Sequence, residues 1–297
     1  MVGALSREAM LNELGYVRPK SLDEALAELN QPGLTGQVLA GGTDLLRDLK
    51  RRVNGIDLLV DVAEVPDLKR IEWTGDGRIV LGAGVTMAEI LENPGLIERV
   101  PLLADGCRVV GGPQIRNQAT VGGNVANGAA CADLTTVLVC LEADALVAAA
   151  TGERRIPVAE LVADLPGGLP AGSLIRAFEF TPPDPAETTA YLRLAPREAM
   201  SIARAALAVL GGLGEDGRVT SVRLAWGAVF PHPRRAPEVE AILFGRKLDD
   251  RVLQEAVRAM EKVFIRESGD RWSAPFKRNV VTAFTERGLR QVLGGFS

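Results

Sequence analysis

Histidine is nearly absent from this chain of 297 residues, in which His232 is the only one. It stands between Pro231 and Pro233, and this setting indicates a turn. A single histidine excludes a histidine-rich metal site, and its place in a turn argues against pairing with a catalytic serine or cysteine. We therefore expect no histidine-based catalytic centre.

Cysteine is also scarce, and no two of Cys107, Cys131 and Cys140 have C-x-x-C spacing. Three cysteines cannot build a four-cysteine iron–sulfur cluster from this chain alone. We interpret them as reduced, mostly buried thiols and predict no metal site.

Aromatic residues make up 4% of the chain, so the core is expected to consist mainly of alanine, valine and leucine. The longest apolar runs, such as Ala205 to Leu210, are far too short to span a bilayer. The N-terminus lacks the pattern of a signal peptide, and the net charge of −4 argues against a nucleic-acid binder. The sequence therefore predicts a cytoplasmic protein without a membrane span.

Glycine, by contrast, is concentrated in two loops. One runs from Gly111 to Gly128 with hydroxyl and amide side chains between the glycines, and the other lies in the stretch from Val38 to Leu46. The stretch from Val38 to Leu46, the first loop in chain order, reads as an apolar strand, a glycine turn and a helix start, where free N–H groups suit a phosphate. The stretch from Gly111 to Gly128 is the second loop. Two such loops suggest a ligand with two linked phosphates. The alternative is that both are ordinary tight turns.

The N-terminal region alternates helix and strand, which predicts a small parallel sheet. The expected elements are a helix from Leu22 to Leu29 opened by a capping box at Ser21, a strand from Gln37 to Ala40, a helix from Thr43 to Arg51 and a strand from Leu58 to Val62. After Pro66 the pattern changes. A hairpin is expected around Gly75-Asp76-Gly77, then a helical pattern from Leu96 to Val109, a helix from Leu134 to Ala143, and strands over Ala145 to Ala150, Arg154 to Val158 and Leu174 to Phe180.

The segment Thr181-Pro182-Pro183-Asp184-Pro185 is the expected linker, because prolines continue neither a helix nor a central strand. Beyond it we expect strands over Thr188 to Leu194 and Arg218 to Val229, and helices over Asp249 to Phe264 and from Pro275 to about Leu293. Met200 to Leu210 fits a helix or a strand. Strands followed by helices predict an α+β second domain.

Together the two loops and the residues around them resemble one family. The matching residues are Ala40-Gly41-Gly42-Thr43-Asp44-Leu45-Leu46, Ile115-Arg116-Asn117-Gln118-Ala119-Thr120-Val121-Gly122-Gly123-Asn124, Ala132-Asp133-Leu134, Gly227-Ala228-Val229 followed by Pro231, and Glu238 to Gly245. They resemble the FAD-binding medium subunit of the molybdenum hydroxylases, a group that includes the carbon monoxide dehydrogenase medium subunit and the xanthine dehydrogenase flavin domain. The likeness covers nearly the whole chain. The 4-hydroxybenzoyl-CoA reductase branch is disfavoured, since its cysteine-bearing insert after the second loop is missing.

The resemblance implies an α+β fold. It consists of a two-subdomain FAD-binding domain of the vanillyl-alcohol-oxidase (PCMH-like) type, followed by an α+β C-terminal domain with a small antiparallel sheet and helices. We expect the FAD-binding domain at 1–181, with subdomains at about 1–64 and 65–181, and the C-terminal domain at 186–297. The resemblance also implies a heterotrimer, assembled as a dimer of heterotrimers. A large partner would carry the molybdenum–pterin cofactor, and a small partner two [2Fe–2S] clusters.

The site residues also follow from the resemblance. The backbone N–H groups of residues 41–44 would hold one end of the FAD pyrophosphate, and the second loop would hold the other end through Thr hydroxyls and the Asn124 amide. Asp133 is an N-cap of its helix, a flavin contact, or both. Arg116 would neutralise a phosphate or form a surface ion pair. The full predicted cofactor-binding set is Leu39, Ala40, Gly41, Gly42, Thr43, Asp44, Ala119, Thr120, Gly122, Gly123, Asn124, Asp133, Ile175, Tyr191 and Arg193.

Tyr191 and Arg193 are placed in this set because strand alternation puts them on the same face. Family members often have a tyrosine followed two residues later by a lysine here, and Arg193 replaces that lysine. The alternative is a half-buried strand tyrosine beside an exposed arginine. In the functional reading this face covers the flavin, so that Tyr191→Ala changes its spectrum and Arg193→Ala its reduction potential.

The predicted function is electron transfer from the iron–sulfur clusters of a partner through non-covalent FAD to an external acceptor. No catalytic residue is expected, because the flavin supplies the redox chemistry and the protein positions it. Two alternatives differ in class: a self-sufficient flavoenzyme related to vanillyl-alcohol oxidase, and a nucleotide-binding structural module without turnover.

Overall fold

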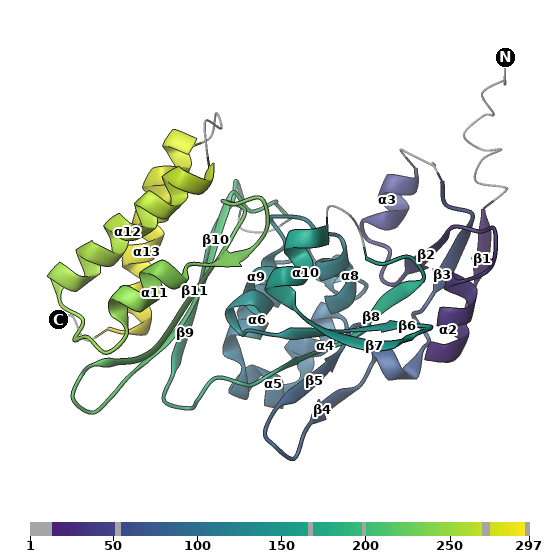
Figure 1. Cartoon of the computed structure of the whole chain (residues 1–297), viewed down its shortest axis with the longest axis horizontal. Coiled ribbons are helices and arrows are strands. Elements are labelled where there is room, and N and C mark those ends of the chain that lie inside the picture. The colour runs from purple at the N-terminus through teal and green to yellow at the C-terminus, as the bar shows by residue number, and fades with distance from the viewer. Residues whose placement is uncertain (1–13, 51–54, 166–168, 198–199, 269–273, 295–297) are drawn as a thin grey trace.

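Three sheets follow one another along the chain, as Figure 1 shows from the N-terminus to the C-terminal helices. The computed structural model describes residues 14–50, 55–165, 169–197, 200–268 and 274–294. This arrangement of helices and mostly antiparallel sheets confirms the predicted α+β class.

The first sheet is small and parallel, as predicted, with the order β1-β3-β2. Its strands are β1 (Gly15–Val17), β2 (Gly36–Leu39) and β3 (Leu58–Asp61), accompanied by helices α2 (Leu22–Leu29) and α3 (Leu45–Leu49). Half of the predicted capping box forms at α2. Ser21 Oγ accepts from the Glu24 N–H at 3.2 Å, while the Glu24 carboxylate accepts from the Lys20 N–H. Ala25, Leu26 and Leu29 of α2 pack on this sheet.

The middle sheet is antiparallel, with the order β4-β5-β8-β6-β7. A 3-10 helix (Pro66–Leu68) leads into it, and its strands are β4 (Ile71–Trp73), β5 (Ile79–Gly82), β6 (Asp144–Ala149), β7 (Gly152–Pro157) and β8 (Ser173–Phe180). The hairpin predicted around Gly75-Asp76-Gly77 forms between β4 and β5.

Short helices fill the connection from β5 to β6. They are α4 (Met87–Glu92), α5 (Pro94–Arg99), α6 (Pro101–Arg108), α7 (Pro113–Arg116), α8 (Val121–Ala126) and α9 (Asp133–Cys140), and α10 (Val158–Asp164) follows β7. The helical pattern predicted from Leu96 to Val109 is interrupted. Val100 leaves the helical conformation at φ −137° and ψ 61°, and Pro101 begins the next helix.

The last sheet is antiparallel with the order β12-β11-β10-β9, and it lies between two helical layers (Figure 1). Its strands are β9 (Thr188–Leu194), β10 (Ala205–Leu213), β11 (Val219–Gly227) and β12 (Arg234–Arg235), and the helices after it are α11 (Pro237–Leu243), α12 (Asp250–Ser268) and α13 (Ala274–Val292). Leu207 and Val209 of β10 face the core shared with α11–α13, whereas Ala208 and Leu210 face the core shared with α6 and α9. Helix α9 is therefore covered by the C-terminal sheet.

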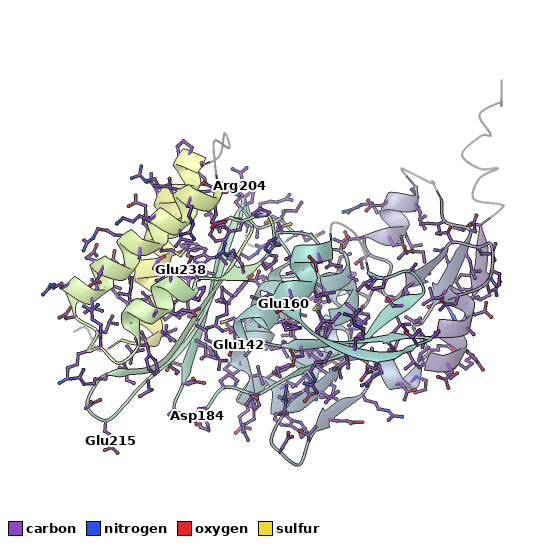
Figure 2. The ribbon with its side chains drawn as sticks, viewed as in Figure 1. Glu142, Glu160, Asp184, Arg204, Glu215 and Glu238 are labelled. Atoms are coloured by element: carbon purple, nitrogen blue, oxygen red, sulfur yellow. The ribbon has the colours of Figure 1, made fainter. Side chains whose placement is uncertain are left out.

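An ion-pair cluster near the end of α9 links this helix to the C-terminal sheet. Glu142, labelled in Figure 2, accepts from Arg223 Nε at 3.1 Å and also pairs with Arg235. The two arginines belong to the C-terminal sheet. The contact therefore ties the C-terminal part to the helices before it. The domain boundaries themselves stay a prediction. Within the described ranges, no helix is both long and apolar enough to cross a membrane.

Candidate functional site

The first glycine loop leaves β2 and presents four consecutive backbone N–H groups. Among the described residues, no acceptor takes a hydrogen bond from the N–H groups of Gly41, Gly42, Thr43 or Asp44. Gly42 has φ +67°, a conformation that glycine adopts without strain. Consecutive free N–H groups in such a turn form a concavity for an anion. The loop therefore has the chemistry predicted for one end of a pyrophosphate site.

The two glycine loops touch at Gly41. A Cβ added there would lie 1.8 Å from the Gln118 carbonyl oxygen, so only glycine allows this approach of the two backbones. Gln118 directly precedes the second loop residues Ala119 and Thr120. Segments that are far apart in the sequence therefore meet, and Gln118 is a structural residue of the site that was not in the predicted cofactor-binding set.

The second loop differs from the first because several of its backbone N–H groups are already used. Val121 donates to Val85 O at 2.9 Å and Gly122 to Ala83 O at 2.8 Å. Thr120 caps helix α8, since its Oγ accepts from the Gly123 N–H at 3.1 Å. The N–H groups of Val121, Gly122 and Gly123 are therefore not available to an anion, which gives weight to the side chains of this loop.

Side chains and open space in the second loop remain available. Asn124 Oδ1 accepts from the N–H and hydroxyl of Thr135, and its NH₂ group bonds to no described residue. A Cβ at Gly123 would meet only Thr120 Oγ1, at 3.0 Å, whereas one at Gly122 would lie 2.7 Å from Ala83 Cβ. Gly122 is thus required for packing, and Gly123 faces open space.

Asp133 is the centre of a buried polar cluster. Its Oδ1 accepts from Tyr191 OH at 2.7 Å and from Arg193 Nε at 3.0 Å. The side chains of Asp133 and Arg193 are each 8% exposed, so the pair is largely removed from water. Arg193 also donates to Ser201 O. The predicted shared face of Tyr191 and Arg193 is confirmed, because both reach the same carboxylate oxygen.

The alternative role of Asp133 as a helix N-cap is wrong. Ala132 is the N-cap residue of α9, and Asp133 is the first residue of the helix. The carboxylate is instead directed to β9, where two donors compensate for its burial.

The surroundings change the proton affinity of this cluster. Desolvation raises the pKa of Asp133, while the hydrogen bond from Tyr191 and the charge of Arg193 oppose the rise. Desolvation and the neighbouring carboxylate raise the pKa of Tyr191 well above its ordinary value. The nearby thiol of Cys131, which is partly exposed, also has a raised pKa because of desolvation, with Asp133 and Asp44 adding to the rise.

Arg116 binds backbone carbonyl groups through one of its terminal nitrogens. Its Nη1 donates to Arg108 O at 3.2 Å and to Val110 O at 3.1 Å, at the C-terminal end of α6. Among the described residues Arg116 forms no ion pair, so the surface ion pair considered from the sequence is not found, while its role toward a phosphate stays a prediction. Three other predicted residues are buried: Leu39 is 9%, Ala119 8% and Ile175 6% exposed, and Ile175 packs in the middle core.

Two family models match the chain. The model described as the FAD binding domain in molybdopterin dehydrogenase covers residues 11–182, and the CO dehydrogenase flavoprotein C-terminal domain covers residues 190–292. Among curated proteins, the chain is 30% identical over 281 residues to the glyceraldehyde dehydrogenase medium chain of Sulfolobus acidocaldarius, covering 94% of this chain and 98% of that protein. It is 28% identical to the xanthine dehydrogenase FAD-binding subunit of Escherichia coli O157:H7, covering 96% of this chain and 97% of that protein.

The fold has solved counterparts as well. A chain of the reconstituted CO dehydrogenase from Oligotropha carboxidovorans superposes with a TM-score of 0.85 and 26% identity, covering 94% of this chain and 97% of that one.

Proposed function

We propose that the two glycine loops hold FAD in this chain, which belongs to the family of FAD-binding domains in molybdopterin dehydrogenases. The chain is the FAD subunit of a multisubunit oxidoreductase. The observation that carries this proposal is the set of free N–H groups at residues 41–44, in contact with the second loop through Gly41. A pyrophosphate needs several donors converging from one side, and this surface offers them without rearrangement.

The roles of the remaining residues follow from their donors. In our proposal the free N–H groups of the first loop bind one phosphate. The Thr120 hydroxyl and the Asn124 NH₂ group, both from the second loop, bind the other phosphate. Gly123 leaves room beside them. Asp133 orients Tyr191 and Arg193, so that an aromatic ring and a cation are fixed next to the second loop. Arginine keeps the charge of the lysine that is frequent in the family at this place but changes the donor geometry.

The chemistry at this site is redox chemistry that bound FAD supplies, as an acceptor and donor of electrons. The chain contributes binding, orientation and a fixed positive charge. It needs no general acid or base for this task, which agrees with a site made of backbone amides, hydroxyls and one buried ion pair. We propose that the FAD is non-covalent and released by acid.

The proposed partners are a large subunit with the molybdenum–pterin cofactor and a small subunit with [2Fe–2S] clusters. The medium-chain names of the relatives support this, and so does a second similar solved structure, which is described as a Cu,Mo-CO dehydrogenase. We further propose a dimer of such heterotrimers. A cytoplasmic location is proposed because Cys107, Cys131 and Cys140 are all free thiols.

Anaerobic reduction of the bound flavin tests the electron-transfer role. We expect substrate to bleach the flavin absorbance only when the two partner subunits are present. Reduction by substrate in the isolated chain would favour a self-sufficient flavoenzyme, and a chain that takes up no flavin would favour a structural module.

A further inference from the structure

The motif Gly227-Ala228-Val229 has no part in the proposed flavin contacts, although it lies directly beside the loop that precedes α9. A Cβ at Gly227 would lie 2.2 Å from Thr136 Oγ1, so the end of β11 approaches α9 more closely than any side chain would allow. Thr136 in turn donates from Oγ1 to Ala132 O at 3.1 Å. The end of β11 therefore contacts Thr136, the residue whose hydroxyl donates a hydrogen bond to the Ala132 carbonyl.

Ala228 has an unusual backbone conformation and uses both of its polar backbone groups. Its φ is +62°, in the left-handed region that residues with a Cβ rarely adopt. In this conformation its N–H donates to Ala130 O at 2.6 Å. Its carbonyl oxygen accepts a hydrogen bond from Lys277 Nζ, on helix α13. Ala228 is thus held from one side by the C-terminal helices while it binds the loop on the other side.

These contacts fix the residues on both sides of Cys131. The Ala130 carbonyl accepts a hydrogen bond from the Ala228 N–H, and the Ala132 carbonyl accepts one from the Thr136 hydroxyl. Asp133, which follows, orients Tyr191 and Arg193. The charges of Asp133, Asp44 and Arg193 all act on the Cys131 thiol, so this segment is close to both the first glycine loop and the Asp133 cluster.

We propose that Lys277 is a positioning residue of the site, which acts through Ala228 to fix the segment Ala130-Cys131-Ala132. The effect on the segment is a property of the chain itself. Its consequence for the flavin rests on the proposed function. Lys277 lies in α13 and Ala130 in the turn between α8 and α9, so the contact couples the C-terminal helices to the loop next to the site.

The reactivity of Cys131 reports the position of this segment without any cofactor. Cys107 and Cys140 are fully buried, whereas Cys131 is partly exposed, so iodoacetamide should label Cys131 selectively. In the FAD-free chain, Lys277→Met should raise the labelling rate of Cys131 about tenfold, because losing the charge-assisted hydrogen bond to Ala228 shifts a local opening equilibrium. Lys277→Arg should restore a rate near wild type.

Lys262→Met is the matched control, since Lys262 is exposed on α12. It should label like wild type. Equal labelling of Lys277→Met and wild type would overturn the proposal, and so would an equal increase in Lys262→Met. If Lys277→Met shows no cooperative melting, Lys277→Gln takes its place with the same expectation, because its shorter, uncharged amide does not supply a charge-assisted hydrogen bond to Ala228.

Flavin binding separates this proposal from the proposed function. After loading with FAD, Lys277→Met should shift the flavin absorption spectrum or weaken FAD binding, and Lys277→Arg should not. Altered Cys131 labelling in a chain that binds no FAD would refute the proposed function and support the positioning role. Wild-type labelling with normal FAD binding and an unchanged spectrum would refute the positioning role alone.

Discussion

Replacing Gly123 with valine should abolish FAD binding and leave the fold intact. Gly123 lies in α8, and a Cβ added to it meets only Thr120 Oγ1, at 3.0 Å. The two valine methyl groups would extend into the open space beside the second loop. This is the space that we assign to the phosphate end of the cofactor.

The expected effects differ greatly in size. Valine is a better helix former than glycine, which stabilises α8, whereas its contact with Thr120 weakens the cap of this helix. Because these effects oppose each other, the free energy of unfolding should change by about 1 kcal/mol or less. FAD affinity should fall by about 100-fold or more, which corresponds to about 2.7 kcal/mol of binding free energy.

Two titrations of the same preparation test this prediction. Urea unfolding gives the stability, and quenching of FAD fluorescence gives the dissociation constant. Gly95→Val is the matched control, because Gly95 also lies in a short helix and a Cβ there meets nothing closer than Asn93 Oδ1 at 3.4 Å. The control should bind FAD like wild type. Wild-type affinity in a folded Gly123→Val variant would refute the assignment of this loop.

Three further variants test other parts of the site. Gly41→Ala should lose both stability and bound FAD, because its Cβ would lie 1.8 Å from the Gln118 carbonyl oxygen. Urea titration should show a free energy of unfolding about 2 kcal/mol lower than that of wild type. Unchanged stability would contradict the close approach of the two backbones. Above pH 10 the folded chain keeps the Tyr191 proton that the unfolded chain releases, so the free energy of unfolding should fall by up to about 1.4 kcal/mol per pH unit. In urea titrations across this range, Tyr191→Phe should show a shallower decline than wild type. Parallel curves for the two proteins would argue against the raised pKa of Tyr191. Arg193→Ala should lower the reduction potential of bound FAD in dye equilibration, because it removes a nearby cation, whereas an unchanged potential would mean that Arg193 only holds Asp133.

The first loop and the last strands could be predicted from the sequence because their signals are local. The strand from Thr188 to Leu194 alternates, follows a proline-rich linker, and has the predicted bounds. The segment from Met200 to Leu210 gave no clear period, and the structure gives the physical reason. Residues Ala205 to Leu210 of β10 are buried on both faces of the sheet, so polar residues do not alternate with apolar ones.

The partners of Asp133 could not be predicted from local pattern, because they come from a distant strand. Asp133 stands at a helix start, where an acidic residue commonly caps the backbone. Tyr191 and Arg193 offer two side-chain donors from β9, and they replace that local role. In the same way Arg116 caps carbonyls at the end of α6, a contact that depends on how the chain folds back. The contact between Gly41 and Gln118 likewise joins two loops whose separation in sequence hides it.

The flavin content of the purified protein tests the central claim most directly. The chain, produced with its partners or titrated with FAD, should hold a single FAD, and acid precipitation should release all of it into the supernatant. Saturating FAD that leaves the folded wild-type chain without bound flavin would contradict the account, and so would wild-type flavin content in the folded Gly123→Val variant.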